Sequence, residues 1–399
     1  MLDLRSGEPI YIAGSVRTPI GRFGGGLAAM SAPDLGAVVV RAAVARAAIP
    51  TEAITQTIMG HGRQAGAGPN PARQASIRGG ISIEAPAFTV NQACASGMKA
   101  VMLGAQSLRL GVADAIVCGG MESMSNTPYL VPSARWGARL GHVELVDGMY
   151  QDGLLCPLSG DLMGRTAERL AEQYGIDRAR QDRFALDSQQ RAAAATTAGA
   201  FADELVAVEV PGRKGPVTIV EDEHIRPDST LESLAKLKPV FKEGGTVHPG
   251  NSSGITDGAA AMVVVTESAV EKHGLTPQAR ILAAAEAGVD PAIMGIGPVP
   301  AVRKLLNGVD LAIDDIDLVE LNEAFAAQVL AVCDDLAIDS ARLNVNGGAI
   351  ALGHPIGCTG ARVIVTLIHA LEQRGASNGL ATLCVSGGMG TSLLLERVS

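Results

Sequence analysis

Three side chains stand in small-residue segments where they could do nucleophilic or acid–base chemistry: Cys94, His354 and Cys384. Cys94 lies in the run Asn-Gln-Ala-Cys-Ala-Ser-Gly, directly before a segment with helical periodicity at 96–110. A helix N-terminus presents unpaired amides and the positive end of the helix dipole, which favour a thiolate over a thiol of ordinary pKa ~8.5 and can hold an oxyanion. Cys94 is therefore a candidate nucleophile, and a buried packing cysteine is the alternative.

His354 is a candidate base for that nucleophile. It is the imidazole of a glycine-bracketed run, Gly-Gly-Ala-Ile-Ala-Leu-Gly-His-Pro-Ile-Gly, that precedes another helical segment. Such a run indicates a backbone that bends closely around something, and a neutral imidazole there could accept the proton of a thiol. A capping or core histidine is the alternative.

Cys384 and Asn322 extend the candidate site. Cys384 ends an apolar strand and is followed by Val-Ser-Gly-Gly-Met-Gly, whose glycines expose backbone amides. A second thiol there could act as an acid or base, or it could simply pack, as we expect of Cys118 in the corresponding position of the first half. Asn322 lies at a strand-to-helix junction in Glu-Leu-Asn-Glu-Ala-Phe. It could cap the helix or orient a catalytic water, and the spacing does not decide between the two.

The elements that must position these side chains alternate between short apolar strands and longer amphipathic helices. This pattern predicts an α/β fold with parallel sheets covered by helices on both faces. The predicted strands lie at 9–13, 56–60, 87–91, 115–118 (ended by two glycines) and 258–265, the helices at 31–48, 96–110, 161–174, 178–198 and 267–273, a small hairpin at 207–210 and 217–220, and long loops at 125–160.

The two ends of the chain echo one another. The run Ala-Ile-Val-Cys-Gly-Gly-Met-Glu-Ser at 115–123 resembles Ala-Thr-Leu-Cys-Val-Ser-Gly-Gly-Met-Gly-Thr at 381–391, and the run around Cys94 resembles the one before His354. We therefore expect two related α/β halves, with chance similarity of glycine-rich turns as the alternative. The predicted division is an N-terminal half at 1–122, an inserted domain at 123–250, a return to the N-terminal half at 251–275 and a C-terminal half at 276–399.

Composition excludes several classes of function. Among the 399 residues, Lys plus Arg is 32 and Asp plus Glu is 41, so the net charge of −9 disfavours binding to nucleic acid or to an anionic membrane. No apolar run reaches the ~18–20 residues of a membrane span, and the first residues lack the apolar core of a signal peptide. The six cysteines form no CxxC pair and do not cluster with the histidines. We therefore expect reduced thiols, no metal site and a cytoplasmic location.

Taken together, these motifs resemble those of the thiolases, the family of acetyl-CoA acetyltransferases and 3-ketoacyl-CoA thiolases. The resemblance spans essentially the whole chain, and it implies thiolase-like duplicated α/β halves in a layered αβαβα arrangement with an inserted loop domain. The matching segments are Arg-Thr-Pro-Ile-Gly-Arg-Phe-Gly at 17–24, Asn-Gln-Ala-Cys-Ala-Ser-Gly at 91–97, Gly-Gly-Met-Glu-Ser-Met-Ser-Asn at 119–126, Gly-Asn-Ser-Ser-Gly-Ile-Thr-Asp-Gly-Ala-Ala at 250–260, Asn-Glu-Ala-Phe at 322–325, the run at 346–360 and the loop after Cys384.

The resemblance implies a role for each candidate. Cys94 matches the nucleophile that becomes acylated, and His354 matches the histidine that activates it and contributes to an oxyanion hole. Cys384 matches an acid/base thiol, and Asn322 a residue that holds a water in that hole. The amides of Cys94 and Ser386 would form a second hole, where the family often has glycine in place of Ser386. The implied reaction is reversible condensation of two acetyl-CoA to acetoacetyl-CoA plus CoA, or thiolysis of 3-ketoacyl-CoA, through an acyl-cysteine and with no metal or other cofactor.

The inserted domain would cover the coenzyme A of the substrate. The residues that match CoA contacts are Arg226, Ser253, Leu154, Met163, Phe241 and Phe325. One position departs from the short-chain members of the family, because Leu162 stands where a histidine often precedes the matching methionine. Longer or branched acyl chains therefore stay open, as does the direction of the reaction.

Two alternatives share the scaffold. A condensing enzyme like the ketoacyl-carrier-protein synthases usually pairs its cysteine with two histidines, or with His and Asn, so Cys384 argues against it. A non-catalytic acyl-CoA or lipid carrier needs none of the four candidate residues. The resemblance further implies a homo-oligomer, dimer or tetramer, in which the stretch 129–150 around Trp136 joins two dimers. A loop that folds back on its own subunit is the alternative.

Overall fold

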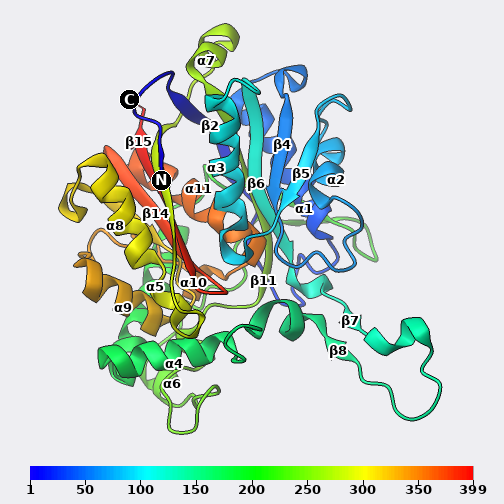
Figure 1. The fold of residues 1–399 in the computed structure, drawn as a ribbon, viewed down its shortest axis with the longest axis vertical. Helices are drawn as coiled ribbons and strands as arrows, with labels where there is room; N and C mark the ends of the chain where they lie inside the picture. The colour runs from blue at the N-terminus through cyan, green and yellow to red at the C-terminus, as the bar shows by residue number, and fades with distance from the viewer. Residues whose placement is uncertain (399) are drawn as a thin grey trace.

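A computed structural model describes residues 1–398 and shows two halves of one sheet that meet where β12 pairs with β2 (Figure 1). The strands of the first half are β2 (Ile10–Arg17), β4 (Gln56–Gly60), β5 (Ala87–Val90), β6 (Ala115–Ser123) and β11 (Thr256–Thr266); those of the second half are β12 (Ala279–Gly288), β13 (Leu318–Leu321), β14 (Asn378–Val385) and β15 (Met389–Arg397); β1 (Leu2–Asp3) and β3 (Gly21–Arg22) pair at the side.

The two halves repeat the same topology. The strand order is β2-β11-β6-β4-β5 in the first half and β12-β15-β14-β13 in the second, and in both the first two pairings are antiparallel and the next is parallel. Leu343 pairs in parallel with Val319 of β13, where β5 pairs with β4 in the first half. This repeated order confirms the predicted duplication.

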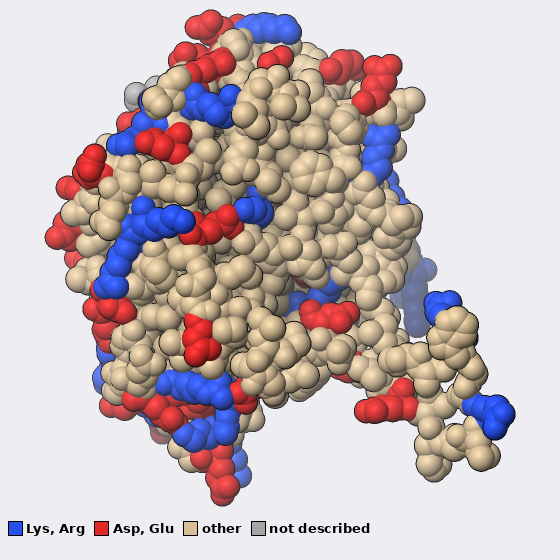
Figure 2. Space-filling model, in the orientation of Figure 1, with Lys and Arg blue, Asp and Glu red and all other residues tan. Residues whose placement is uncertain are grey.

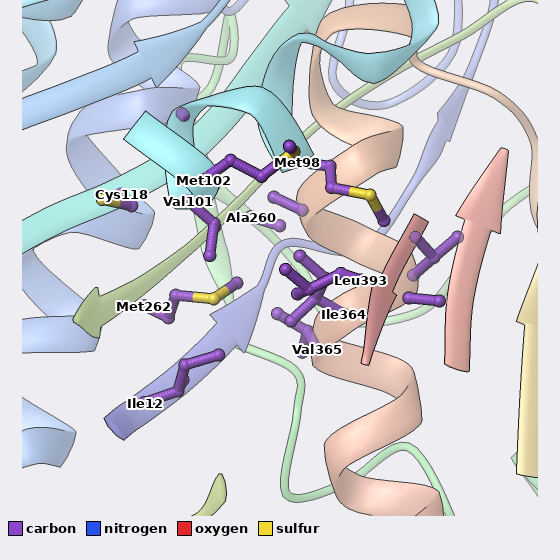
Figure 3. Packing of buried hydrophobic residues seen from close by; sticks show 14 of the residues in the cluster. Ile12, Met98, Val101, Met102, Cys118, Ala260, Met262, Ile364, Val365 and Leu393 are labelled. Carbon is purple, nitrogen blue, oxygen red and sulfur yellow. The ribbon is translucent and has the colours of Figure 1, made fainter. Parts of the chain in front are cut away.

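Helices form three layers around the two halves of the sheet. The six that do so are α1 (Ala32–Ala47), α2 (Pro71–Arg78), α3 (Ser96–Arg109), α8 (Pro298–Val309), α9 (Ala326–Leu336) and α11 (Ile356–Arg374). Apolar residues of α3 and α11 share one core with both halves of the sheet, as Met98, Val101, Ile364 and Leu393 show in Figure 3. Helices α1 and α2 cover the other face of the first half, and α8 and α9 that of the second. The layers are therefore αβαβα, as the resemblance implies.

Two expectations about the strands were wrong. The sheet is mixed rather than parallel, because β11 and β15 return antiparallel between their neighbours. In addition, β6 continues through Gly119 and Gly120 to Ser123 instead of ending at Cys118. A side chain at Gly119 would overlap the backbone of β11, and one at Gly120 the carbonyl of Gly357 in the first turn of α11. These glycines therefore permit close packing of a continuous strand.

The segment between β6 and β11 carries the remaining elements of the first half. They are β7 (Tyr129–Leu130), β8 (Val146–Asp147), α4 (Met163–Tyr174), α5 (Arg178–Thr197), β9 (Val208–Val210), β10 (Val217–Ile219) and α6 (Leu231–Ala235); α7 (Glu267–His273) follows β11, and α10 (Ala349–Leu352) precedes α11. The predicted helices and the β9–β10 hairpin are confirmed. Between β7 and β8 the chain projects from the body as an arm (Figures 1 and 2).

No helix within residues 1–398 combines the length and the apolar character needed to cross a membrane.

Candidate active site

Cys94 lies in a strained turn between β5 and α3. Ala93 adopts a left-handed backbone with φ of 45°, which costs roughly 1–2 kcal/mol for a residue with a Cβ. Hydrogen bonds over-determine the turn: the Ala93 amide donates to Asn91 Oδ1 at 2.9 Å, and Ser96 Oγ donates to the Ala93 carbonyl at 2.7 Å. The turn fixes Cys94 at the start of α3, with only 8% of the residue exposed. Such held strain is typical of functional positions.

The first turns of α3 and α11 pack directly on each other. A Cβ at Gly97 would lie 2.6 Å from the Ala361 amide nitrogen, and one at Gly360 would overlap the backbone of Met98. Only glycine permits this approach. Because His354 lies two residues before the start of α11, the crossing brings the segments that carry Cys94 and His354 to the same place in the centre of the molecule.

His354 is held in one tautomer by Thr359. The Thr359 hydroxyl donates its proton to the Pro355 carbonyl at 3.0 Å, so it must accept the hydrogen bond from His354 Nδ1 at 2.6 Å. The proton of the neutral ring is therefore on Nδ1, and Nε2 carries the lone pair. Burial lowers the pKa of His354 to about 3, with the charges of Arg63 and Arg362 adding to the effect. The imidazole is neutral at pH 7 and available as a base.

Asn322 lies beside His354 at the end of β13. Its amide nitrogen Nδ2 is 3.5 Å from His354 Nε2, and its backbone amide donates to the Thr382 carbonyl on β14 at 3.0 Å. Its side-chain oxygen is buried without a partner among the described residues. An unpartnered acceptor beside the base is suited to hold a water molecule.

Cys384 ends β14 close to Cys94. Burial raises the pKa of the Cys384 thiol, and the neighbouring Cys94 raises it further. The turn that follows passes through Gly387 and Gly388, both left-handed at φ of 88° and 86°, and it points the Ser386 amide at the Cys94 sulfur. The predicted second oxyanion donor therefore faces the candidate nucleophile.

The expected lowering of the Cys94 pKa is not what the structure shows. Burial raises the pKa of the Cys94 thiol, and this outweighs the opposing hydrogen bond from the Ser386 amide, the charge of Arg63 and the amide of Cys94 itself. Cys94 is therefore a thiol at rest, and as a nucleophile it would need a base to take its proton. Cys118, by contrast, is buried in the core on β6 (Figure 3), as expected of a packing residue.

Several of the predicted CoA contacts gather beside Cys384. Met163, Phe241 and Phe325 belong to one apolar cluster with it, and the two phenylalanine rings meet edge to face with centroids 6.1 Å apart. The Ser253 amide donates to the Ala324 carbonyl at 3.0 Å, next to Phe325 in the chain.

A cavity of about 280 Å³ opens next to this cluster. Met163 and Ser386 line it, and Leu154 ends the π-helical turn Tyr150–Leu154 that forms one wall. Leu162, in place of the histidine, immediately precedes α4 without capping it. The full lining is Gln151, Asp152, Gly153, Leu155, Cys156, Pro157, Leu158, Met163, Ser386 and Gly387.

Arg226 does not belong to the group of residues around Cys94 and Cys384. It is exposed after β10, and its backbone amide donates to Gln189 Oε1 at 2.7 Å. Within residues 1–398 the Arg226 side chain forms no hydrogen bond or ion pair that links it to Cys94 or Cys384, so its contact with CoA stays a prediction.

Sequence reasoning missed three residues of this site: Arg63, Glu122 and Thr359. Arg63 and Glu122 are buried close to Cys94, and Thr359 orients His354. The available signals were a charged residue in the Gly-His-Gly-Arg-Gln run at 60–64, and the presence of Glu122 and Thr359 in the matching segments 119–126 and 346–360. No group of three or more His, Cys, Asp or Glu side chains within residues 1–398 could hold a metal ion.

The duplicated αβαβα fold with a buried thiol, a neutral histidine and a second thiol defines a class of enzymes that transfer acyl groups through cysteine. The family model of the thiolase N-terminal domain matches residues 10–268, and that of the thiolase C-terminal domain matches residues 275–397. The chain therefore belongs to the thiolase family and is an acyltransferase with thiolase function.

Individual relatives are similar over nearly their whole length. An acetyl-CoA acetyltransferase of Escherichia coli (strain K12) is 52% identical over 389 residues, covering 97% of this chain and 99% of the relative. The crystal structure of the Bacillus anthracis acetyl-CoA acetyltransferase superimposes with a TM-score of 0.97 at 44% identity, covering 99% of this chain and 100% of that one. The crystal structure of human mitochondrial 3-ketoacyl-CoA thiolase in complex with CoA superimposes with a TM-score of 0.95 at 42% identity, covering 100% of both chains. These relatives do not favour a carrier-protein synthase or a non-catalytic carrier.

Proposed function

We propose that the chain condenses two acetyl-CoA to acetoacetyl-CoA plus CoA, and catalyses the reverse thiolysis, through an acyl group on Cys94. The observation that carries the proposal is the convergence of Cys94, His354, Asn322 and Cys384 at the centre of the fold. The printed names of the relatives support CoA thioesters as the substrates.

The first half-reaction acylates Cys94. Its sulfur attacks the thioester carbonyl carbon as His354 Nε2 takes the thiol proton, and the C–S bond to CoA breaks when the CoA sulfur leaves with that proton. Because burial raises the pKa of Cys94 and lowers that of His354, proton transfer alone is uphill, so it must accompany C–S bond formation. The amides of Cys94 and Ser386 would hold the oxygen of the tetrahedral intermediate.

The second half-reaction forms the carbon–carbon bond. Cys384 first passes its thiol proton to His354 Nε2, and the resulting thiolate removes an α-proton from a second acetyl-CoA. The enolate carbon attacks the acyl carbonyl, and Cys94 leaves as a thiolate that regains its proton from His354 Nε2. A raised pKa makes the Cys384 thiolate a strong base, as a weakly acidic α-proton requires. The enolate oxygen would be held by His354 and by a water on Asn322.

The remaining expectations complete the proposal. Residues 123–250 would cover CoA, with Arg226 on the adenine, Ser253 on the pantetheine, and the apolar walls Leu154, Met163, Phe241 and Phe325 around it. The division into a 1–122 half, its return at 251–275 and a 276–399 half goes with this role. We further propose a cytoplasmic homo-oligomer without metal or other cofactor, and with an acyl range that Leu162 leaves open beyond acetyl.

The direct test is cleavage of acetoacetyl-CoA in the presence of CoA, followed by the Cys384→Ser variant. The variant should still form acetyl-Cys94, seen by mass spectrometry, while its condensation rate falls ~10²–10⁴-fold because the base is lost. Cys118→Ala, at the matching place in the first half, is the control and should retain condensation.

Two outcomes would contradict the proposal. A parent that binds acetoacetyl-CoA without cleaving it would be a carrier. An equal fall of both half-reactions in Cys384→Ser, with unfolding temperature unchanged, would remove the separate role of Cys384.

A further inference from the structure

A buried arginine at the active site has no partner. Arg63 follows β4, and only 4% of the residue is exposed. Its backbone amide donates to the Glu122 carboxylate at 3.2 Å, but its guanidinium makes no hydrogen bond within residues 1–398, and Nε and Nη2 are fully buried. Burial accordingly lowers the pKa of Arg63, yet an arginine stays charged at pH 7. Burying a charged guanidinium without hydrogen-bond acceptors lowers the stability of the fold, so we infer that Arg63 is kept because it binds a ligand.

The nearby carboxylates, Glu122 and Asp152, are close enough for their charges to act on Arg63, but within residues 1–398 neither accepts a hydrogen bond from its guanidinium. Glu122 is occupied by other donors: the Gly62 amide at 3.1 Å, the Gly357 amide at 2.9 Å and His61 Nε2 at 3.1 Å. Asp152 is exposed and forms no ion pair with Arg63 within 4.0 Å. Glu122 therefore anchors the backbone of Arg63 and leaves its side-chain donors free.

The guanidinium lies behind the wall of the cavity. A side chain at Gly153 would overlap the guanidinium, so the two are in direct contact, and Gly153 lines the same cavity as Ser386 and Met163. Arg63 is also close enough to Cys94 for its charge to act on the thiol. Cys94 therefore has a buried cation near it, and Gly153 separates this cation from the cavity. The cavity of about 280 Å³ has room for a short acyl chain.

The acceptor for Arg63 must be an oxygen that the reaction itself does not use. In the proposed function, the two thioester oxygens are held by the amides of Cys94 and Ser386 and by His354 with Asn322. We propose that Arg63 binds a carboxylate at the far end of the acyl chain, so that the acyl-CoA thioesters of short dicarboxylic acids are substrates. This inference rests on the proposed function and specifies its substrate class. A guanidinium suits such a group because it can donate two parallel hydrogen bonds to one carboxylate.

The test compares a charged and an uncharged substrate of matched length. The thiolysis kcat/KM is measured for the CoA thioester of 3-oxohexanedioic acid and for 3-oxohexanoyl-CoA, in the parent, Arg63→Leu and Arg63→Lys. The ratio of the two values should favour the dicarboxylic substrate in the parent and fall roughly 10- to 100-fold in Arg63→Leu, as expected for a lost charge-assisted hydrogen bond. Arg63→Lys, which keeps the charge without the fork, should fall in between.

A second measurement isolates acylation. Mass spectrometry of Cys94 after exposure to succinyl-CoA or butyryl-CoA should show succinyl-enzyme formed faster in the parent, and this preference should be lost in Arg63→Leu. A parent without that preference, or an Arg63→Leu variant that slows both thioesters equally, would overturn the inference; the latter would assign Arg63 to the Cys94 thiolate instead. The proposed function fails separately, if the parent cannot cleave acetoacetyl-CoA, and the acylation measurement still decides the role of Arg63.

Discussion

The acid–base state of single residues in this site depends mainly on burial. Both thiols have raised pKa values and the imidazole a lowered one, so Cys94, Cys384 and His354 are all uncharged at rest. In the proposed function, charge would appear only when substrate arrives, and the amides of Cys94 and Ser386 are already in place to meet it. Such preorganised dipoles act most strongly where water is excluded.

We predict that iodoacetamide inactivates the enzyme by alkylating Cys94. The raised pKa means that little thiolate is present at pH 7, so the inactivation rate should rise as the pH increases, up to tenfold per unit until the pKa is passed. Peptide mapping should show activity lost in step with Cys94 labelling. Cys358, whose pKa burial raises to about 12, should react far more slowly.

The control for this experiment is Cys156→Ser. The pKa of Cys156 is lowered because hydrogen bonds from Ser159, Leu158 and Gly387 outweigh its desolvation, and it lines the cavity. It is therefore a competing site of labelling. Inactivation of the Cys156→Ser variant should proceed at the parent rate. Inactivation that follows Cys156 or Cys118 while Cys94 stays unmodified would remove Cys94 as the nucleophile.

We predict that Thr359→Val slows Cys94 acylation roughly ten- to a hundredfold, by analogy with other residues that orient a functional histidine. Valine has a similar shape but cannot accept the hydrogen bond from His354 Nδ1, so the ring is no longer held with its lone pair on Nε2. Thr359→Ser keeps the hydroxyl and should retain most of the rate.

The pH profile distinguishes this role from a general loss of stability. With a His354 pKa of about 3, acylation in the parent should show no acid limb near pH 6.5, because the imidazole stays neutral there. In Thr359→Val the acid limb of the pH–rate profile should move to higher pH if the His354 ring turns toward water. Equal rates in the Val and Ser variants would show that Thr359 only packs.

At this scale, the sequence predicted the residues that carry unusual local signals. Cys94, His354 and Cys384 stand in glycine-rich or small-residue runs, and the structure places them at one centre. Arg63 and Thr359 also stand in glycine-containing runs, but their roles were missed because a missing or fixed hydrogen-bond partner is a property of the folded chain. The sign of the Cys94 pKa shift was missed for the same reason: the helix end was visible, but the depth of burial was not.

At the scale of elements, the β14–β15 turn decides whether a second oxyanion donor exists. Its donor is a backbone amide, so the identity of the side chain at Ser386 should matter little. We predict that Ser386→Ala retains activity, whereas Ser386→Pro, which has no N–H, lowers kcat ~10²–10³-fold. The measurement is condensation rate beside unfolding temperature. Comparable losses in both variants would mean that the hydroxyl, not the amide, acts on the substrate.

Local periodicity predicted most elements but not their pairing. Residues 56–60 and 267–273 form β4 and α7 as predicted, because a short buried run specifies the strand and the caps Thr266 and Gly274 specify the helix locally. Strand direction depends on which distant strand lies alongside, so the antiparallel returns of β11 and β15 were not visible. The continuation of β6 past Gly119 depends on how closely α11 approaches, which is again a tertiary property.

At the scale of the whole molecule, the duplication explains where the site lies. Equivalent central helices from the two halves, α3 and α11, start side by side, and each is preceded by one member of the Cys94–His354 pair. Equivalent strands, β6 and β14, carry Cys118 and Cys384 at matching positions. One copy became packing and the other a candidate base, because only the β14 end reaches the cavity through its turn.

The arm between β7 and β8 does not pack against the rest of its own chain. Trp136 is 90% and Leu140 96% exposed, and the arm projects from the body instead of folding back on it (Figure 2). Exposed apolar residues in a long projecting loop are typical of an interface. We therefore predict that the arm joins two dimers of this chain into a tetramer.

The test replaces residues 131–145 with a short Gly/Ser linker and measures mass by light scattering. This deletion is narrower than 129–150, since Met149 is buried in the core and Tyr129 pairs with Asp147 at the base of the arm. The variant should be a dimer where the parent is a tetramer, with acetoacetyl-CoA cleavage as the check that it folds. The milder Trp136→Ser, Leu140→Ser double variant should weaken the tetramer in the same direction, because it removes the apolar contacts and leaves the backbone intact. A parent that is already dimeric, or a tetramer that survives loss of the arm, would contradict the prediction and assign the exposed residues to another surface.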